Sequence, residues 1–496
     1  MDLITFAHEN GLAVTNQLSR EEQKAFGQFM TPPAIAHAMA ARACAGLDGS
    51  TIRILEPAAG AGVLAAAVVS EILQLPNPPK RLELVLCELD NRIALALKRL
   101  ADRMRRAAAV AGVDLRVSIR IEDFLLSKLS RAEARFDIVV ANPPYFKIKK
   151  CDPRAVRHSY AVYGQPNIYG LFMAACARVL ASNGRWCFIT PRSWTNGQYF
   201  LAARRELLRL LHIDAIHIFE SREAHFTDDE VLQEAVITWA TARARAGGMI
   251  TFSTSDGVRD LPHAVLRTLP TCEIIGPADE SVIYLPTVAG AEIFRDFKAN
   301  LATYGLKVST GPVVAFRAAK HIAQSARTGT VPLLWMQHIR PMRVSWPIQK
   351  KREHIAANAA TGWMMVPNAN MVVIRRFSPK EDERRIIAAP YLAGRLPGPV
   401  LGLENHTNYL YRAGGDLTPE EANGLGAFLN SRLVDRYLRT VAGNTQVNAA
   451  DLRALPLPPI GDLINIGRAL SDGCTLAEVD QAVETFLGAS PAALTA

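Results

Sequence analysis

Short apolar runs alternate with helix-like patterns through the first half of the chain. The runs have the length of buried strands and cover residues 52–55, 82–87, 115–121, 136–141, 186–189, 213–219 and 235–240. Patterns with helical periodicity separate them and cover residues 61–73, 93–106, 171–180 and 200–211. Alternating strands and helices are typical of a parallel α/β sheet with helices on both faces. The sequence therefore predicts such a sheet, with about six or seven strands.

The alternation stops near residues 241–248, and the chain beyond is rich in proline, glycine, arginine and short strand-like runs. A length of 496 residues is enough for about two to four domains. We therefore predict an α/β domain over residues 1–245 and a second domain, of mixed α+β type, over residues 246–496. In the second domain, apolar residues at helical spacing predict a helix over residues 424–441.

Composition excludes a disordered or fibrous chain, because 49% of the residues are hydrophobic and 21% are charged. The 56 lysines and arginines outnumber the 47 aspartates and glutamates, which leaves a formal charge of +9. An excess of positive charge favours a polyanionic partner such as nucleic acid.

The first residues lack the basic segment and apolar run of a signal peptide, and no 18 apolar residues follow one another anywhere. The seven cysteines are scattered and form no C-x-x-C pair, and the eleven histidines show no metal-ligand spacing. We therefore expect a protein of the reducing cytoplasm that does not bind a membrane and holds no metal.

Candidate chemistry is concentrated in Asn142-Pro143-Pro144-Tyr145, directly after the apolar run over residues 136–141. Ligands of open α/β sheets bind outside the carboxyl ends of the strands. Two prolines stiffen the loop and leave the Pro143 carbonyl free to accept a hydrogen bond, and the Asn142 side chain offers a second acceptor. Two such acceptors can polarise a planar NH₂ group for attack on an electrophile, while the Tyr145 ring can stack on a base. The alternative interpretation is a turn that only closes a strand.

Acidic residues follow three earlier strands of the predicted sheet. The segment Leu55-Glu56-Pro57-Ala58-Ala59-Gly60-Ala61-Gly62 is a poor dinucleotide fingerprint, but its small residues allow close approach of a ligand, and its glutamate suits a cationic one. Glu88, in Cys87-Glu88-Leu89-Asp90, is placed to accept ribose hydroxyls. Asp123-Phe124 offers an acceptor for an adenine amino group beside an aromatic ring.

Taken in order, these motifs resemble the S-adenosylmethionine-dependent DNA adenine-N6 methyltransferases, in particular the Taq-type and Pst-type enzymes of bacterial restriction–modification systems. Gln28-Phe29-Met30-Thr31-Pro32-Pro33 is similar to the N-terminal cofactor motif of the family. Residues 167–172 and 189–194 are similar to its later framework motifs. The resemblance covers about residues 25–240 and implies a Rossmann-like methyltransferase sheet followed by a target-recognition domain.

The resemblance also implies roles for individual residues. The residues expected to bind S-adenosyl-L-methionine are Thr31, Glu56, Pro57, Ala58, Gly60, Glu88, Leu89, Asp123 and Phe124. Those expected to be catalytic are Asn142, Pro143, Tyr145 and Phe226. Phe226 would stack on the flipped adenine opposite Tyr145, and Phe219 is a competing candidate for this position.

Double-stranded DNA is the partner that the resemblance implies. Lys147 and Lys149 are candidates for phosphate contacts, and the alternative is a solvated basic loop. Asn444, Gln446 and Asn448 are candidates for base contacts, although the asparagines could instead cap and turn the chain. The implied role is protection of host DNA from a cognate restriction endonuclease, encoded as another polypeptide, and a monomer would suffice for it.

Two other functions fit the same residues. Asn-Pro-Pro-Tyr serves any planar NH₂ acceptor, so an RNA or protein-glutamine N-methyltransferase is one alternative. Such relatives usually lack a large domain after the catalytic one, whereas about 250 residues follow here. The other alternative is a DNA-specificity module that has lost catalysis, which the intact Asn142–Tyr145 segment and the acidic residues disfavour.

Overall fold

A computed structural model gives the fold of the chain. It describes residues 2–15, 31–131, 136–219, 235–242, 248–255, 257–258, 260–276, 281–285, 294, 296–349, 352–377, 383–441, 447–470 and 473–488. Contacts divide the chain into two compact units, Met1–Thr287 and Val288–Ala496. No helix among the described residues is long and apolar enough to cross a membrane.

The first unit is built on a nine-stranded sheet with the order β3-β2-β1-β4-β5-β7-β6-β8-β9. The strands are β1 (Thr51–Glu56), β2 (Arg81–Glu88), β3 (Asp114–Ile121), β4 (Phe136–Ala141), β5 (Leu180–Pro191), β6 (His212–Phe219), β7 (Ala235–Thr241), β8 (Met249–Ser255) and β9 (Val265–Pro270). Strands β1 to β5 are parallel to their neighbours among themselves, and β7 is antiparallel to both β5 and β6. This topology confirms the predicted Rossmann-like sheet.

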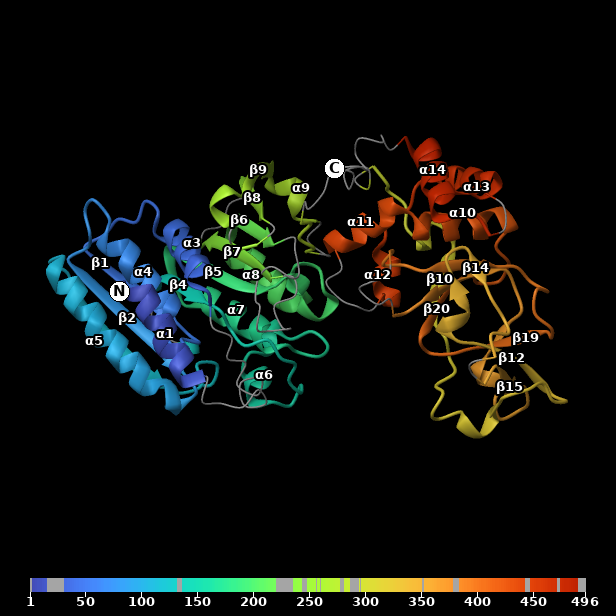
Figure 1. Ribbon diagram of the computed structural model, residues 1–496, viewed down its shortest axis with the longest axis horizontal. Coiled ribbons are helices and arrows are strands. Elements are labelled where there is room, and N and C mark those ends of the chain that lie inside the picture. Colours follow the sequence, from blue (N-terminus) through green and yellow to red (C-terminus); the bar gives the residue numbers. More distant parts are fainter. Residues whose placement is uncertain are drawn as a thin grey trace. The chain divides into compact units, whose positions relative to one another are not determined.

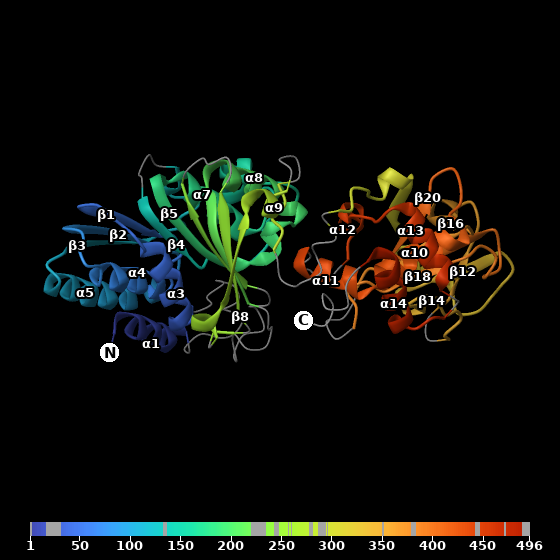
Figure 2. The ribbon, with the colours of Figure 1, turned by 90° about the horizontal axis from the view of Figure 1, so that it is seen from above.

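Helices cover both faces of this sheet (Figures 1 and 2). Helices α1 (Leu3–Thr15), α3 (Pro33–Cys44), α4 (Val63–Leu73) and α5 (Ala94–Val110) lie on one face, and α7 (Ile168–Arg178) and α8 (Leu201–Leu210) lie on the other. Each layer encloses its own apolar core against the sheet. Burial of both faces explains why the central strands are almost continuously apolar.

The sheet extends beyond the domain boundary expected at residues 245/246. Strand β8 pairs in parallel with β6, and β9 is antiparallel to β8, so the first unit ends at Thr287. Ile250 and Phe252 of β8 are buried in the core on the α7 and α8 side. The sequence concealed this extension because β9 is largely exposed and lacks an apolar run.

The second unit is of mixed α+β type, as predicted. One four-stranded sheet contains β10 (Leu306–Thr310), β20 (Thr407–Arg412), β17 (Met371–Arg375) and β18 (Ala388–Tyr391). A five-stranded sheet contains β11 (Ile322–Ala323), β15 (His354–Ala356), β12 (Thr330–Leu334), β19 (Val400–Leu403) and β16 (Met365–Pro367). The short pair β13 (Ile339–Arg340) and β14 (Arg343–Val344) completes the strands of the described part of this unit.

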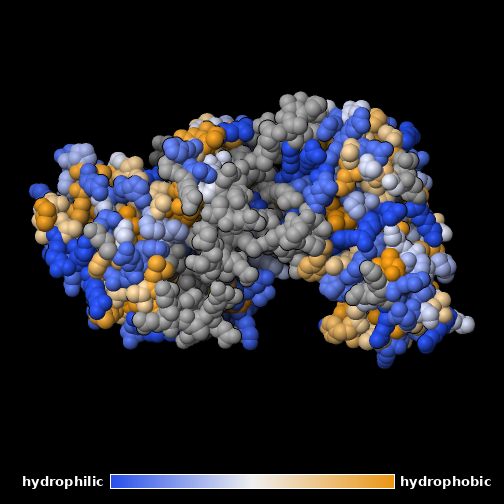
Figure 3. Space-filling view, viewed as in Figure 1, coloured by the Kyte–Doolittle hydropathy of each residue, from blue (hydrophilic) through white to orange (hydrophobic). Residues whose placement is uncertain are grey.

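Helices α10 (Pro419–Asn430), α11 (Arg432–Val441), α12 (Ala449–Ala454), α13 (Ile460–Ala469) and α14 (Leu476–Leu487) belong to the same unit. Glycines allow α10 and α13 to cross closely, because a Cβ on Gly424 would overlap the Leu463 carbonyl oxygen. On the face seen in Figure 3, hydrophilic side chains gather over α11.

The single helix expected over residues 424–441 is two helices. Helix α10 begins earlier, at a capping box in which Thr418 and Glu421 bond each other's backbone amides. Ser431 then adopts an extended conformation between α10 and α11, and its hydroxyl accepts a hydrogen bond from the Val434 amide at 3.2 Å. The apolar stripe runs across this break, so periodicity alone did not reveal it.

Candidate active site

The carboxyl ends of the parallel strands bring the predicted site residues to one edge of the sheet. Glu56 ends β1, Glu88 ends β2 and Asn142 follows β4. Glu88 and Asn142 each extend two residues beyond Glu56, since Glu56 pairs with Leu86 and Leu55 pairs with Val139. The strand order reverses between β1 and β4, which is the position where open α/β sheets bind their ligands.

Asn142 is held from a distant part of the chain. Its Nδ2 donates a hydrogen bond of 3.1 Å to Oγ1 of Thr31, which is buried just before α3. The Tyr145 hydroxyl contacts Asn142 Oδ1 and donates to the Ile189 carbonyl of β5 at 2.9 Å. Both the amide nitrogen and the amide oxygen of Asn142 are therefore fixed in orientation.

Pro143 supplies a second acceptor beside Asn142. The residue is buried, and no donor in the described part of the chain bonds its carbonyl oxygen. A buried acceptor without a donor is costly, which is typical of a position that a ligand completes. Burial also raises the pKa of Tyr145, so its hydroxyl stays protonated at neutral pH.

The loop after β1 approaches β2 closely. The Gly60 amide donates to Glu88 Oε2 at 2.7 Å, and the Ala59 amide donates to the Cys87 carbonyl at 2.8 Å. Gly60 and Gly62 both have positive φ, at 50° and 80°. A Cβ on Gly62 would also lie 2.7 Å from a methyl carbon of Leu100 in α5, so glycine is required there on two grounds.

Glu88 and Glu56 are carboxylates in a dry environment. Glu88 Oε1 accepts from the amides of Leu89 and Asp90, both at 2.8 Å, while burial raises its pKa against these hydrogen bonds. Glu56 is 2% exposed and accepts from the Ala65 amide at 3.0 Å. Burial raises the pKa of Glu56 well above its usual value. A buried carboxylate at this edge suits a cationic group of a ligand.

Asp123 and Phe124 follow β3 and differ in exposure. Asp123 Oδ1 accepts from the Leu125 amide at 2.9 Å, and its Oδ2 lies 3.8 Å from the Arg154 guanidinium. Phe124 is buried in the core, where its ring stacks on Phe172 with 5.8 Å between centroids. In this structure Phe124 belongs to the apolar core that also contains Leu55 of β1 and Ala141 of β4.

Comparison with known proteins identifies the family of this chain. The family model "Eco57I restriction-modification methylase" matches residues 89–226. The type II methyltransferase M.BsuBI of Bacillus subtilis is 32% identical over 484 residues, which cover 93% of this chain and 94% of that protein. The type II methyltransferase M.PstI of Providencia stuartii is 31% identical over 478 residues, or 93% and 92% of the two chains. The chain belongs to the type II methyltransferases of restriction–modification systems.

As a member of this family, the protein is a DNA methyltransferase, and S-adenosyl-L-methionine is its methyl donor. The donor set at the sheet edge fits that molecule. Glu56 is a buried acid that a cationic group beside it would ionise, the Gly60 loop leaves room for close approach, and the oxygens of Glu88 can accept further hydrogen bonds.

Basic residues after the Asn142–Tyr145 loop fall into two groups in this type II methyltransferase. Lys147 and Lys149 are exposed on either side of buried Ile148. Arg154 instead forms an ion pair of 2.7 Å with Asp152, and Arg157 donates to the Ser127 carbonyl at 2.9 Å. The two lysines therefore fit an external anion better than these two arginines do.

Of the residues expected to contact bases or to stack on the flipped adenine, the structure describes only some. Asn448 precedes α12, and its amide donates to Asp451 at 2.8 Å in a capping box, so it has the capping role. Phe219, the competing candidate for the base clamp, is buried in the core and packs against His217. Phe226, Asn444 and Gln446 lie outside the described residues.

Tyr169 and Ser193, which the sequence marks only as members of the segments 167–172 and 189–194, contact each other near Tyr145. The Tyr169 ring lies edge-on to Tyr145, with 5.7 Å between centroids, and its hydroxyl lies 2.7 Å from Ser193 Oγ. No pattern in a single sequence marks such a contact, because it joins α7 to the turn after β5.

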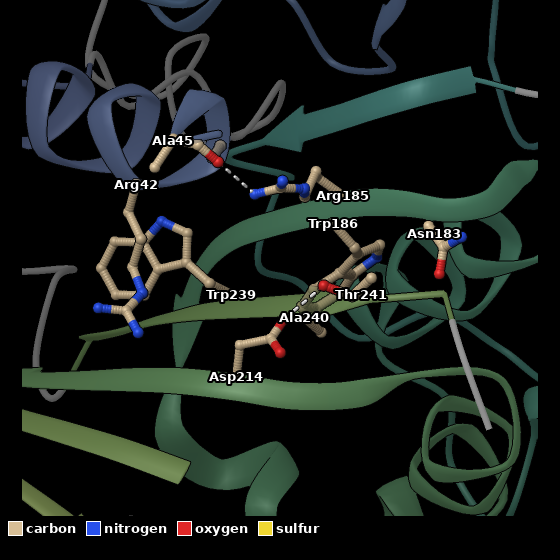
Figure 4. Close-up of a pocket in the computed structure, with 10 residues that line it drawn as sticks. Arg42, Ala45, Asn183, Arg185, Trp186, Asp214, Trp239, Ala240 and Thr241 are labelled. Atoms are coloured by element: carbon tan, nitrogen blue, oxygen red, sulfur yellow. Dashed lines mark hydrogen bonds between the residues drawn. The ribbon is translucent and has the colours of Figure 1, made fainter. Parts of the chain in front are cut away.

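A pocket of about 470 Å³ lies at the opposite edge of the sheet (Figure 4). Asn183 and Arg185, from the beginning of β5, line it, whereas the catalytic loop adjoins the end of β5. Its polar groups pair with one another: Arg185 donates to the Ala45 carbonyl, and Thr241 donates to Asp214. This pocket is therefore separate from the candidate active site.

Proposed function

We propose that this type II methyltransferase transfers the methyl group of S-adenosyl-L-methionine to N6 of an adenine in double-stranded DNA. The observation that carries the proposal is the pair of acceptors at the end of β4, Asn142 Oδ1 and the Pro143 carbonyl, beside the Glu56 and Glu88 edge. An exocyclic amino group has two hydrogens, which two fixed acceptors can bind at once.

In the proposed mechanism, Asn142 and Pro143 accept the two amino hydrogens and turn the nitrogen lone pair towards the methyl group. Thr31 keeps the Asn142 amide in the orientation that presents Oδ1. The Tyr145 hydroxyl has a single proton and two acceptors within reach, Asn142 Oδ1 and the Ile189 carbonyl. It can therefore donate to the Ile189 carbonyl alone, which leaves Asn142 Oδ1 to accept from the amino group. Orientation and charge stabilisation would then promote direct transfer without a covalent enzyme intermediate: the N–C bond forms as the S–C bond breaks, sulfur keeps the electron pair as a neutral thioether, and one amino proton is released to water.

The cofactor residues in this proposal are Thr31, Glu56, Pro57, Ala58, Gly60, Glu88, Leu89, Asp123 and Phe124. Bound S-adenosyl-L-methionine supplies an electrophilic methyl carbon. Glu56 would balance its positive charge, Glu88 would accept from its ribose, and Asp123 would accept from its adenine amino group.

Access to N6 in the proposed reaction requires the adenine to leave the base stack. Tyr145 would stack on one face of the flipped base and Phe226 on the other. Lys147 and Lys149 would hold phosphates near it, and the second unit, Val288–Ala496, would recognise the target through residues such as Asn444, Gln446 and Asn448.

The proposed biological role is protection of host DNA in the cytoplasm from a cognate restriction endonuclease. The relatives that support this role are named type II methyltransferases. The endonuclease would be a separate polypeptide, and a monomer would methylate each strand in turn.

Transfer of labelled methyl groups from S-adenosyl-L-methionine tests the reaction. Purified protein is offered duplex DNA, cell RNA and cell protein in parallel, and the modified product is identified by mass spectrometry. We expect N6-methyladenine in duplex DNA, loss of transfer in Asn142→Ala, and DNA binding by that variant within about tenfold of wild type, which is about 1.4 kcal/mol. Label in RNA or glutamine instead of DNA would contradict the proposal.

A further inference from the structure

Tyr169 lies at the start of α7, which the chain brings against the catalytic loop. The Ile168 amide donates to the Phe146 carbonyl at 2.9 Å, and the Ile148 amide donates to the Pro166 carbonyl at 3.0 Å. Lys147 and Asn167 form an antiparallel bridge between these bonds. The residues just after Tyr145 are thus tied to the residues just before Tyr169.

Tyr169 is 1% exposed and contacts its neighbours through both its ring and its hydroxyl. The ring meets the Tyr145 ring edge-on, at 85° and 5.7 Å, and packs on Phe200 at 4.8 Å. The hydroxyl bonds Ser193 Oγ at 2.7 Å. Aromatic pairs with this edge-to-face geometry are attractive beyond the area that they bury.

The turn that carries Ser193 is itself fixed by a buried arginine. Arg204 of α8 is 2% exposed and donates to the carbonyls of Trp194 and Gly197 at 2.9 and 3.0 Å. It also donates to the Ser281 carbonyl at 2.6 Å. Ser193 is therefore a rigid support for the Tyr169 hydroxyl.

Tyr145 has two independent restraints in this arrangement. Its hydroxyl is held by the Ile189 carbonyl and Asn142, and its ring is held by Tyr169. We infer that Tyr169, anchored by Ser193, is a positioning residue that sets the plane of the Tyr145 ring for stacking on the target base. This inference rests on the proposed function, because that function makes Tyr145 the stacking residue.

Tyr169 does not touch the reacting atoms in this account, so its loss acts through Tyr145. A misplaced ring weakens stacking on the flipped base and misaligns the amino group, and such errors lower the rate of transfer more than the binding of either substrate. The Tyr169→Phe variant keeps the ring and loses only the bond to Ser193. The Tyr169→Leu variant loses the ring contact as well.

The experiment compares Tyr169→Phe, Tyr169→Leu and Ser193→Ala with wild type and with Phe252→Leu. Phe252 is a buried aromatic of the same core on β8, so this control reports loss of packing alone. Duplex DNA with 2-aminopurine at the target position reports stacking of the flipped base through its fluorescence. The kcat, the KM for S-adenosyl-L-methionine and the Kd for DNA are measured with each variant.

For Tyr169→Leu we expect kcat to fall about tenfold or more, with KM and Kd within about twofold of wild type. Its 2-aminopurine signal should also differ from that of wild type. Tyr169→Phe and Ser193→Ala should each lower kcat about threefold. The double variant should lose no more than either single variant, because both substitutions remove the same hydrogen bond. A Tyr169→Leu variant that matches Phe252→Leu in kcat and fluorescence would overturn the inference.

Thermal unfolding does not depend on enzymatic activity, so it tests this inference separately from the proposed function. Tyr145→Leu, Tyr169→Leu and the double variant are unfolded thermally. If the rings support each other, the double variant loses less in Tm than the two single losses added together. Additive losses would overturn the positioning role, whereas absence of DNA methylation by the wild-type protein would overturn the proposed function alone.

Discussion

Asn142 Nδ2 and Thr31 Oγ1 are joined by a hydrogen bond of 3.1 Å across 111 residues of sequence. The bond links the segment before α3 to the loop after β4, so the N-terminal motif and the Asn142–Tyr145 loop lie together. Because the amide nitrogen is occupied in this way, the amide oxygen is presented as an acceptor. Thr31, expected as a cofactor residue, thus also orients the proposed catalytic asparagine.

Replacement of Thr31 by valine should lower kcat by about tenfold, since loss of one buried hydrogen bond costs about 1–3 kcal/mol. Valine has nearly the shape of threonine but lacks the hydroxyl, so the free energy of unfolding should fall by no more than about 1–3 kcal/mol, the cost of the lost bond. Thr31→Ser keeps the hydroxyl and is the matched control. Steady-state methylation of duplex DNA measures both variants. Equal kcat for Thr31→Val and wild type would show that the bond does not orient Asn142.

Glu88→Ala should weaken binding of S-adenosyl-L-methionine by about tenfold or more. The substitution removes the acceptor of three backbone amides, those of Gly60, Leu89 and Asp90, and a buried donor left without an acceptor costs about 1–3 kcal/mol. Isothermal titration calorimetry measures the affinity. Glu122→Ala is the control, because Glu122 is a half-exposed carboxylate that follows the adjacent strand β3. The same loss in both variants would contradict a specific role for Glu88.

Glu56 should make the cofactor-free protein less stable as pH rises. Burial raises its pKa in the folded state, with a smaller contribution from Glu88, so the folded state keeps a proton that the unfolded chain has released. Stability is therefore lost as pH rises from the usual glutamate value through the raised one. Glu56→Gln removes this titration.

Thermal unfolding at several pH values checks the effect of Glu56. The Tm of Glu56→Gln relative to wild type should increase as the pH is raised from about 4, the usual glutamate range, through neutral pH. A difference in Tm that stays constant over this range would show that the carboxylate does not titrate in the folded protein as its burial implies.

Gly62→Ala should destabilise the protein more than Gly60→Ala. Both glycines have positive φ, which costs an alanine about 1–2 kcal/mol. At Gly60 nothing lies within 4 Å of an added Cβ, whereas at Gly62 it would press on Leu100, at a further cost of about 1–3 kcal/mol. Urea unfolding measures both variants. Equal losses would show that α5 moves aside to accommodate the methyl group.

The strands from β1 to β7 could be predicted from the sequence, because burial on both faces leaves apolar runs of strand length between helical patterns. The extension by β8 and β9 could not, since β9 is exposed over most of its length. The break between α10 and α11 was missed for a different reason. Ser431 departs from helical geometry through a local hydrogen bond, which leaves the apolar periodicity unchanged.

The candidate site was predictable to the extent that its residues stand at strand ends. Topology alone brings Glu56, Glu88 and Asn142 to one edge, so their order along the chain was sufficient. Contacts between distant segments, such as those of Thr31 with Asn142 and of Tyr169 with Tyr145, could not be predicted from the sequence. The packing of Phe124 inside the core also depends on the position of Phe172, which periodicity does not specify.

Single-molecule sequencing of genomic DNA tests the central claim most directly. The chain is expressed in a bacterial host that lacks its own methylases, with an empty vector and the Asn142→Ala variant as controls. The account predicts an N6-methyladenine signal in one short sequence motif, present with the wild-type chain and absent from both controls. Confirmed expression with no modified adenine, or with a modified cytosine in its place, would contradict it.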